Sequence, residues 1–326
     1  MPVVERPSRF WHRFDIRRIE DLGNAVLGAE LEAIQLAGPP IRGSLAFAAR
    51  DGIVFSSGLI HGRVAIRGPL SRDAVTVGLG LRLGAGSRHW LNEVVDGDVG
   101  IFLPGDEHDA IYTHGSLYVA ATLTPAQLEE EAAREGLVLD PRMLARTGLH
   151  VRPIPSAKLA WIRPRFVRIH DADAQGEKDH RELTFALLHM VVAHYARIPA
   201  NGDGRIHPRG RGRIVHRARE YIRENLAAPI SIDELAAVAE TSRRTLYRAF
   251  SDILDDTPQS FARRLRLHGI RSELVSGAGG TVSAVARSWG AGADLGRLSA
   301  RYQELFGESP RATLTLHREL RAHAMI

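Results

Sequence analysis

The C-terminal third of the chain carries the same pattern twice, and this repeat limits the fold more than any other feature of the sequence. Each copy has a short segment typical of a helix, a break of a few residues, and a longer segment with apolar residues at helical spacing. Ser231 and Thr281 stand where each first helix is expected to begin, because a hydroxyl there accepts a hydrogen bond from a free N–H group of the first turn. We therefore predict two helix-turn-helix units, a motif whose second helix enters the major groove of DNA.

In the first unit, Ser231 and Glu234 are placed to form a capping box, and Ser242 is placed to cap the second helix. The residues predicted to face inward are Ile232, Leu235, Ala236, Ala239, Leu246, Phe250 and Ile253. The outer face of the second helix carries Arg243, Arg244, Tyr247 and Arg248. Because an arginine can hold the O6 and N7 atoms of guanine with two hydrogen bonds, this face is a candidate for reading bases.

In the second unit, a glycine-rich turn joins the two helices, and Gly307 is predicted to end the second one in the left-handed conformation. The residues predicted to face inward are Val282, Val285, Ala286, Trp289, Leu295, Leu298, Tyr302 and Leu305. Arg297 and Arg301 lie on or near the outer side, and Pro310 begins a last helix. Between the units, residues 258–274 predict one helix of about 25 Å, which can hold the two second helices about 34 Å apart, one turn of DNA.

Four segments of this region resemble the AraC/XylS family of bacterial regulators, over roughly residues 214–320. They are Ser231-x-x-Glu-Leu-Ala, Ser242-Arg-Arg-Thr-Leu-Tyr-Arg-Ala-Phe, Arg264-Leu-Arg-Leu and Phe306-Gly-Glu-Ser-Pro. The resemblance implies a seven-helix DNA-binding domain. It also implies base or groove contacts with double-stranded DNA by Arg244, Tyr247 and Arg248. Ser242, Arg243 and Thr245 are further candidate DNA-binding residues of the same segment.

The second unit departs from the family pattern. Gly290 is followed by Ala291, where members usually have phenylalanine, and the turn is one residue longer than usual. Ala300 occupies the usual arginine position near the middle of the helix. Two alternatives follow: Arg297 and Arg301 substitute for the missing arginine, or this unit binds mainly the DNA backbone.

The charge is divided unevenly along the chain. From residue 201 to 326 there are 20 arginines, no lysine and 14 acidic residues, a net charge of +6, whereas the first 200 residues have a net charge of −1. This asymmetry is typical of a polyanion-binding domain joined to a neutral one. Residues 199–213 are rich in glycine and proline and are predicted to be a linker between domains at 1–198 and 214–326; its Arg209, Arg211 and Arg213 either touch phosphates or belong to a solvated tether.

Residues 43–122 contain short apolar segments separated by turns, with Asp51-Gly52 and Asp96-Gly97 as hairpin-type dipeptides. Such spacing without intervening helices favours an antiparallel β-sandwich or β-barrel. Helices are predicted over 125–135, capped by Thr124, and over 182–197. These helices either form a homodimer seam or simply pack on the barrel. The fold class is therefore α+β in two domains, with an all-α double helix-turn-helix at the C-terminus.

Residues 97–108 resemble a strand-turn segment of the cupin-like sensor barrels of the same family. The resemblance implies a small-molecule effector inside the barrel, and the candidate pocket residues are Trp90, Phe102, His108 and Tyr112, each with ordinary core packing as the alternative. A metal-dependent cupin enzyme is a competing function. Its nearest ligand set is His89, Glu93 and His108, and a second set, His170, Asp171, Asp173 and His180, stands in a polar stretch interpreted as a solvated loop. Because the close His-x-His pair is missing, we predict no catalytic metal and no cofactor.

Other function classes are excluded by composition. There is no cysteine, and therefore no disulfide, thiolate metal site or cysteine nucleophile. No apolar run is long enough to span a membrane, and the first residues lack the apolar core of a secretory signal. The sequence thus predicts a cytoplasmic DNA-binding regulator that is not an enzyme, does not bind membranes and forms a homodimer, with RNA polymerase as a further candidate partner. An architectural DNA binder without ligand control is the remaining alternative.

Overall fold

The computed structural model describes residues 11–139, 144–150, 152–171, 179–197, 210–277, 280–292 and 294–324. The chain divides into two compact units, one formed by Met1–Ala33 and Ile41–His207 and the other by Ile34–Pro40 and Pro208–Ile326. Most of the predicted linker lies outside the described residues. Its last part does not, because the first helix of the second unit begins at Arg211, three residues before the predicted domain start.

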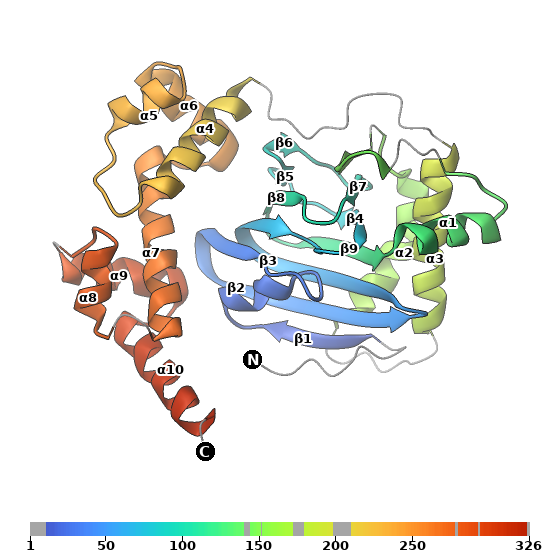
Figure 1. Ribbon diagram of the computed structural model, residues 1–326, viewed down its shortest axis with the longest axis horizontal. Coiled ribbons are helices and arrows are strands. Elements are labelled where there is room, and N and C mark those ends of the chain that lie inside the picture. The colour runs from blue at the N-terminus through green and yellow to red at the C-terminus, as the bar shows by residue number, and fades with distance from the viewer. Residues whose placement is uncertain are drawn as a thin grey trace. The chain divides into compact units, whose positions relative to one another are not determined.

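The first unit is built on a ten-stranded antiparallel sheet (Figure 1). Its strands are β1 (His12–Ile16), β2 (Glu32–Arg50), β3 (Ile53–Pro69), β4 (Val75–Arg82), β5 (Arg88–His89), β6 (Asn92–Glu93), β7 (Val99–Phe102), β8 (Glu107–Tyr112), β9 (Ser116–Leu123) and β10 (Gly148–Leu149). The main order is β10-β7-β4-β9-β3-β8-β5-β6, with β2 on β3 and β1 on β2. The predicted barrel-like architecture is confirmed as a curled half-barrel.

The curl of the sheet comes largely from β3. Its first half pairs with β9 from Val54 to Ile60, and its second half pairs with β8 from Val64 to Pro69. The change of partner occurs at Gly62, whose φ of +152° is reached easily only by glycine, and an added Cβ there would lie 2.6 Å from the Ile41 side chain. One long strand therefore serves two neighbours and folds the sheet over.

The two predicted hairpin dipeptides behave differently. Asp51 and Gly52 both have positive φ, 52° and 80°, as a two-residue type I′ turn requires, and they join β2 to β3. The expectation for Asp96-Gly97 is wrong. This turn connects β6 to β7, which are not neighbours in the sheet, because β6 pairs with β5 and β7 pairs with β4 and β10.

One face of the sheet is covered by helices. They are α1 (Pro125–Arg134), α2 (Ser156–Ile169) and α3 (Asp179–Arg197), and a short 3-10 helix η1 (Ile19–Asn24) precedes β2. The helices at 125–135 and 182–197 are confirmed, as is the Thr124 cap, which accepts a hydrogen bond from the Gln127 amide. Helix α2 was not predicted from the sequence, since it contains Pro164 in its interior, a residue that normally interrupts a helix. Here buried Leu159, Ile162 and Phe166 pack on the core and stabilise the helix.

The second unit contains seven helices in the described residues: α4 (Arg211–Glu224), α5 (Ile232–Val238), α6 (Arg243–Leu254), α7 (Pro258–Ser276), α8 (Val282–Ser288), α9 (Leu295–Phe306) and α10 (Pro310–Ala324). The repeated pattern is confirmed: α5 and α6 form one helix-turn-helix, α8 and α9 form the other, and α7 runs between them (Figure 1). None of the helices described is long and apolar enough to cross a membrane.

The packing of α8 on α7 depends on a glycine in the middle of a helix. A Cβ added at Gly269 would lie 2.4 Å from the ring of Trp289. Trp289 also donates a hydrogen bond of 2.8 Å from Nε1 to Glu273 Oε2 on α7. Glycine costs about 1 kcal/mol relative to alanine in a helix, and here it allows the indole to lie directly against the backbone of α7.

Candidate DNA-binding helices and effector pocket

The first helix-turn-helix has the caps expected from its sequence. Ser231 Oγ accepts from the Glu234 amide while the Glu234 carboxylate accepts from the Ser231 amide, and Ser242 Oγ accepts from the Thr245 amide. The turn places Glu240 in the left-handed region with a φ of 52°. The Thr241 amide then reaches back to the Ala236 carbonyl at 2.9 Å. These bonds fix where α5 ends and where α6 begins.

Four residues of the predicted DNA-binding set lie on the exposed face of α6. Two of them have partners within the protein and two do not. Arg243 forms an ion pair with Asp233 of α5, and the Tyr247 hydroxyl is hydrogen-bonded to Gln259 at the start of α7. Arg244 and Arg248 are exposed and have no hydrogen-bond or ion-pair partner in the part of the chain that the structure describes. Two guanidinium groups on this face are therefore available to an external ligand.

The second helix-turn-helix is built on the same plan. Thr281 and Asp294 cap α8 and α9 by accepting from the Ala284 and Arg297 amides. Gly290, with a φ of 65°, takes the place that Glu240 has in the first turn, and a Cβ there would lie 2.7 Å from the Ala227 carbonyl oxygen. Glycine is therefore required at this position both by its φ and by the space.

The exposed face of α9 is poor in charge. Leu295 was expected to face inward but is 39% exposed, because it is the first residue of the helix and precedes the turn that packs. Arg297 is exposed and pairs with Asp294, the cap of its own helix. Arg301 is exposed, and its charge adds to burial in lowering the pKa of the Arg263 guanidinium of α7, with burial as the larger cause. Both arginines of α9 are thus on its surface.

The Phe306-Gly-Glu-Ser-Pro segment fixes the far end of α9. Gly307 adopts a φ of 76°, and Glu308 accepts a 2.7 Å bond from the buried Arg271 of α7. The Tyr302 hydroxyl bonds Thr313 of α10 at 2.9 Å, and Thr313 bonds Glu308 at 3.0 Å. This buried network joins α7, α9 and α10, and therefore sets the orientation of α9 within the unit.

The arginines assigned to the linker are partly structural. Arg211 lies in the first turn of α4 and forms an ion pair with Asp252 of α6, which makes it part of the helical packing rather than of a solvated tether. Arg213 is exposed in the same helix, and Arg209 lies outside the described residues.

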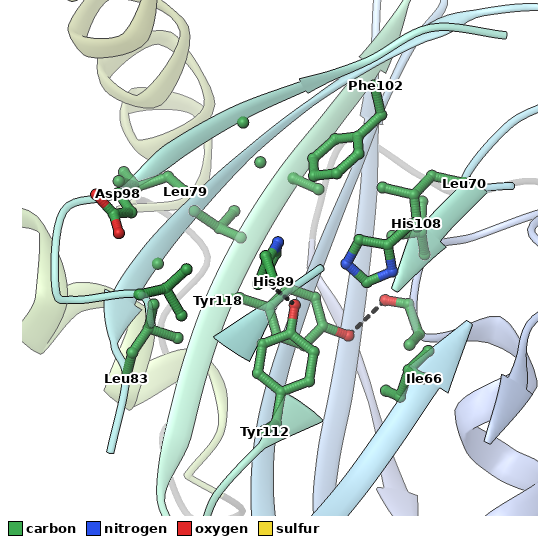
Figure 2. A pocket seen from close by; sticks show the side chains of 18 of the residues that line it. Ile66, Leu70, Leu79, Leu83, His89, Asp98, Phe102, His108, Tyr112 and Tyr118 are labelled. Atoms are coloured by element: carbon green, nitrogen blue, oxygen red, sulfur yellow. Dashed lines mark hydrogen bonds between the residues drawn. The ribbon is translucent and has the colours of Figure 1, made fainter. Parts of the chain in front are cut away.

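A pocket opens on the face of the sheet opposite the helices (Figure 2). It is lined by Ala25, Val26, Leu31, Ile66, Leu70, Gly78, Leu79, Gly80, Leu83, His89, Val94, Asp98, Gly100, Phe102, His108, Tyr112, Tyr118, Val119, Ala120 and Leu149. These residues are mostly apolar, and the cavity that they enclose has a volume of about 50 Å³. The pocket is therefore apolar and narrow.

Three of the four predicted pocket residues, Phe102, His108 and Tyr112, line this pocket, and Figure 2 shows their rings together. Trp90 does not line it. Its ring stacks on Phe102 at a centroid distance of 5.7 Å, and its Nε1 donates to the Glu107 carbonyl oxygen at 3.2 Å. Trp90 thus contacts a lining residue without lining the pocket itself.

The floor of the pocket was not predicted from the sequence. Gly78 on β4 pairs with Gly100 on β7 and with Ala120 on β9, so three very small residues lie side by side across adjacent strands. The Phe102 ring rests on this floor, 2.8 Å from where a Cβ of Gly100 would be. The alternating glycines of the segment from Val77 to Gly80 were a usable signal, because glycine inside a strand often marks a close approach.

The metal set considered from the sequence is not brought together. The rings of His89 and His108 lie with their centroids 5.0 Å apart, but Glu93 is exposed and paired with Arg88. Among the described residues, no group of three or more potential ligands lies close enough to hold a metal ion. Burial lowers the pKa of His108 to about 4 and that of His89 well below its usual value, while Asp109 acts in the opposite direction on both.

The interpretation of His170 as part of a solvated loop is wrong. His170 caps the end of α2 and is 5% exposed, with Nδ1 2.8 Å from Ser44 Oγ and Nε2 2.9 Å from Ser57 Oγ. Both ring nitrogens are used, so the residue ties α2 to β2 and β3. Asp173 and the His180 side chain lie outside the described part of the structure.

Comparison with known proteins places the similarity in the second unit. A family model described as a helix-turn-helix domain matches residues 235–316. The XylDLEGF operon transcriptional activator 2 of Pseudomonas putida is 34% identical over 104 residues, which are 31% of this chain and 66% of that protein. The XylDLEGF operon transcriptional activator of the same organism is 34% identical over 100 residues, 30% of this chain and 31% of its own.

Among solved structures, a probable AraC family transcriptional regulator from Rhodopseudomonas palustris is 36% identical over 32% of this chain and 96% of its own, with a TM-score of 0.31. The chain thus spans from about a third to just under two thirds of the length of the curated relatives it matches. These relatives are transcription activators, and their similarity falls on a chain with two capped helix-turn-helix units joined by one helix. The chain belongs to the AraC/XylS family.

Proposed function

We propose that the protein is a sequence-specific DNA-binding transcription regulator controlled by a small molecule bound in the N-terminal half-barrel. The exposed face of α6 is the observation that carries this proposal. Arg244 and Arg248 extend from a helix whose start, end and inner face are all fixed, so their side chains are presented to DNA without rearrangement of the backbone. Rigid presentation of this kind is what base recognition in the major groove requires.

The roles we propose for the contact residues follow from their positions. Arg244 and Arg248 read bases, and Tyr247 contacts a thymine methyl group or a phosphate. Ser242, Arg243 and Thr245 lie at the N-terminal end of α6, where amide groups and the helix dipole favour phosphate. Arg297 and Arg301 of α9 contact the DNA backbone in the neighbouring groove.

The half-barrel is proposed as the effector site because it holds an apolar pocket with a few polar groups, the usual composition of a small-molecule site. We propose Phe102, His108 and Tyr112 as contact residues, joined by His89 and Tyr118, with Trp90 as a supporting residue. The protein has no catalytic role in this proposal, and its place of action is the cytoplasm, where its DNA is.

A homodimer is a further part of the proposal, since α2 and α3 carry large apolar side chains at the surface. Trp161 is 45% exposed, and Phe185 is 51% exposed with the Arg50 guanidinium 3.4 Å above its ring. Sedimentation velocity at micromolar concentration tests this: a dimer that becomes a monomer in Trp161→Ala supports it, and a wild-type monomer contradicts it. RNA polymerase as a partner is tested by transcription in vitro from the promoter that the protein binds.

Fluorescence anisotropy tests the central proposal. The full chain is titrated onto DNA from its own promoter region and onto scrambled DNA at about 50 to 200 mM salt. Binding that weakens with salt but stays at least about a hundredfold tighter to the promoter is the expected result. Equal binding to both DNAs would indicate electrostatic attraction only and would contradict sequence-specific regulation.

A further inference from the structure

Two histidines of the half-barrel pocket each have one ring nitrogen without a partner among the described residues. His89 and His108 both line it and are 9% and 3% exposed. The Nδ1 atom of each ring is buried and has no hydrogen-bond partner among the described residues. A buried polar atom without a partner costs about 1–3 kcal/mol, so a ligand that bonds these nitrogens recovers energy that the empty pocket loses.

Neighbouring polar groups do not serve these nitrogens. The Tyr118 hydroxyl is used by the Ala25 carbonyl oxygen at 2.6 Å, and the Tyr112 hydroxyl stands 3.4 Å from the Nε2 atom of His89, on the other side of that ring. Figure 2 shows both imidazoles within the pocket, with Phe102 and Tyr112 on either side. Because both rings line the pocket, a ligand bound there is a candidate partner for the two nitrogens.

The pocket offers no positive charge. Among its lining residues, all within the described part of the chain, there is no lysine or arginine, and the one ionisable carboxyl group is that of Asp98. The two imidazoles are uncharged near neutral pH, since burial lowers the pKa of His108 to about 4 and lowers that of His89 well below its usual value. An anion entering this site would lose its hydration and gain no counter-charge.

The shape of the pocket limits the ligand as well. The rings of Phe102 and His108 lie 5.2 Å apart, and those of Tyr112 and Tyr118 are stacked at 5.4 Å. Each pair of rings is in direct contact, so the rings form aromatic walls that suit a flat ligand, and the small volume of the pocket limits that ligand to about one ring. A hydroxyl group both donates and accepts, and therefore satisfies a neutral imidazole in either tautomer.

We propose, on the basis of the function given above, that the effector is an uncharged flat molecule of about one ring, whose hydroxyl or carbonyl group hydrogen-bonds to His89 and His108. A carboxylate of the same size is disfavoured because the site lacks a cation. A hydrocarbon of the same size is disfavoured because it leaves both nitrogens unpaired. Among ligands of the same size, the polar group therefore determines which one binds in this apolar pocket.

Isothermal titration of the full chain with three matched compounds tests this proposal. The compounds are 4-ethylphenol, 4-ethylbenzoate and ethylbenzene, which differ only in the polar group. We expect 4-ethylphenol to bind at least about tenfold more tightly than either of the others, which is about 1.4 kcal/mol. Tighter binding of 4-ethylbenzoate, or equal binding of 4-ethylphenol and ethylbenzene, overturns the proposal.

Two variants assign the effect to the histidines. His108→Phe keeps a ring of similar shape and removes both nitrogens, so 4-ethylphenol should lose about tenfold in affinity while ethylbenzene binds as before. His61→Phe, the same change at a residue outside the pocket lining, should alter neither. Should His108→Phe fail to fold, the test is made on the wild-type chain instead, by measuring the nitrogen NMR chemical shifts of the His108 ring with and without 4-ethylphenol. No change in those shifts on adding 4-ethylphenol overturns the proposal.

The outcomes separate this inference from the proposed function. Promoter-specific DNA binding together with no binding of any of the three compounds up to about 1 mM overturns the inference and leaves the regulator intact. Binding of 4-ethylphenol that depends on His108, in a chain that does not prefer promoter DNA, supports the ligand chemistry and contradicts the regulator.

Discussion

Aligning the two helix-turn-helix units by their N-cap residues pairs α6 with α9 residue by residue and reveals a common frame. Both turns contain a residue in the left-handed region, Glu240 in one and Gly290 in the other. Both second helices end in a left-handed residue, Asp255 and Gly307. The buried positions also correspond: Leu246 with Leu298, Phe250 with Tyr302, and Ile253 with Leu305.

The exposed positions of the same two helices do not correspond. The four outer residues of α6 are Arg243, Arg244, Tyr247 and Arg248, and their counterparts in α9 are Leu295, Gly296, Ser299 and Ala300. The arginines of α9 stand where α6 has Thr245 and Ala249. The turn before α9 is also two residues longer, counted between the caps of the two helices.

This difference teaches that packing and recognition are separable in the motif. The shared residues are those that cap, turn or fill the core, and a change at any of them costs stability. The residues that differ face outward and cost little to change. We infer that the first unit supplies base recognition and the second unit supplies affinity for the DNA backbone.

The largest effect is expected from Arg244→Ala combined with Arg248→Ala. Each bidentate pair with a base contributes about 1–3 kcal/mol of discrimination, so the preference for promoter over scrambled DNA should fall by about 10² to 10⁴. Anisotropy with both DNAs measures it. Arg243→Ala, which removes the same charge from a group already paired with Asp233, should cost less. A double variant that keeps its preference would place recognition elsewhere.

Trp289→Ala tests whether the stability of the second helix-turn-helix depends on the packing of α8 against α7. The indole packs on Gly269 and bonds Glu273, so its removal should lower the free energy of unfolding of this unit by about 2–4 kcal/mol. Hydrogen exchange of the α8 and α9 amides reports it locally. Leu295→Ala, an exposed apolar residue on the same unit, should change stability by less than about 0.5 kcal/mol. Similar losses of stability in both variants would contradict this distinction between buried packing residues and exposed residues.

Ala300→Arg restores in α9 the residue that α6 has at Arg248. We expect DNA binding to tighten about three- to tenfold and a new preference to appear at one base position, because the guanidinium reaches a base edge. Ala300→Lys adds the same charge without the planar fork and should tighten binding without a new preference. Selection from randomised DNA measures the preference. If both variants behave alike, α9 does not approach the bases.

The smallest effect is expected from Arg297→Ala and Arg301→Ala. Each should weaken binding to promoter and scrambled DNA by the same few-fold factor and lower the salt slope by about 1, since a phosphate contact carries no sequence information. Arg72→Ala, an exposed arginine of the first unit paired with Glu30, is the charge-matched control and should leave the slope unchanged. If either α9 variant lost its preference for promoter DNA over scrambled DNA, the second unit would recognise bases as well.

Much of the second unit was predictable because its signals are local. Ser231, Ser242 and Thr281 cap helices through bonds to residues three positions away, and Gly307 ends a helix by its own φ. Such features need no knowledge of distant residues. The exception was Leu295, which has the right spacing for the core but stands at the exposed first position of its helix.

The first unit was predictable only in outline. Alternating apolar residues indicated an antiparallel sheet, and the type I′ turn at Asp51-Gly52 was confirmed. Helix α2 was missed because local propensity disfavours Pro164, whereas packing on the sheet stabilises the helix around it. Similarly, the polar residues around His170 indicated a loop, but the ring itself is buried between two serines of distant strands.

The sequence by itself determined the helix caps, the two inner faces and the family, because these depend on residues within about one or two helical turns of each other. Only the tertiary structure decided which arginines form ion pairs within the protein and which residues line the pocket. Arg243 and Arg211 are paired with carboxylates 10 and 41 positions away. The pocket floor exists because strand pairing brings Gly78, Gly100 and Ala120 side by side. Strand register joins segments far apart in the chain, and no local pattern specifies it.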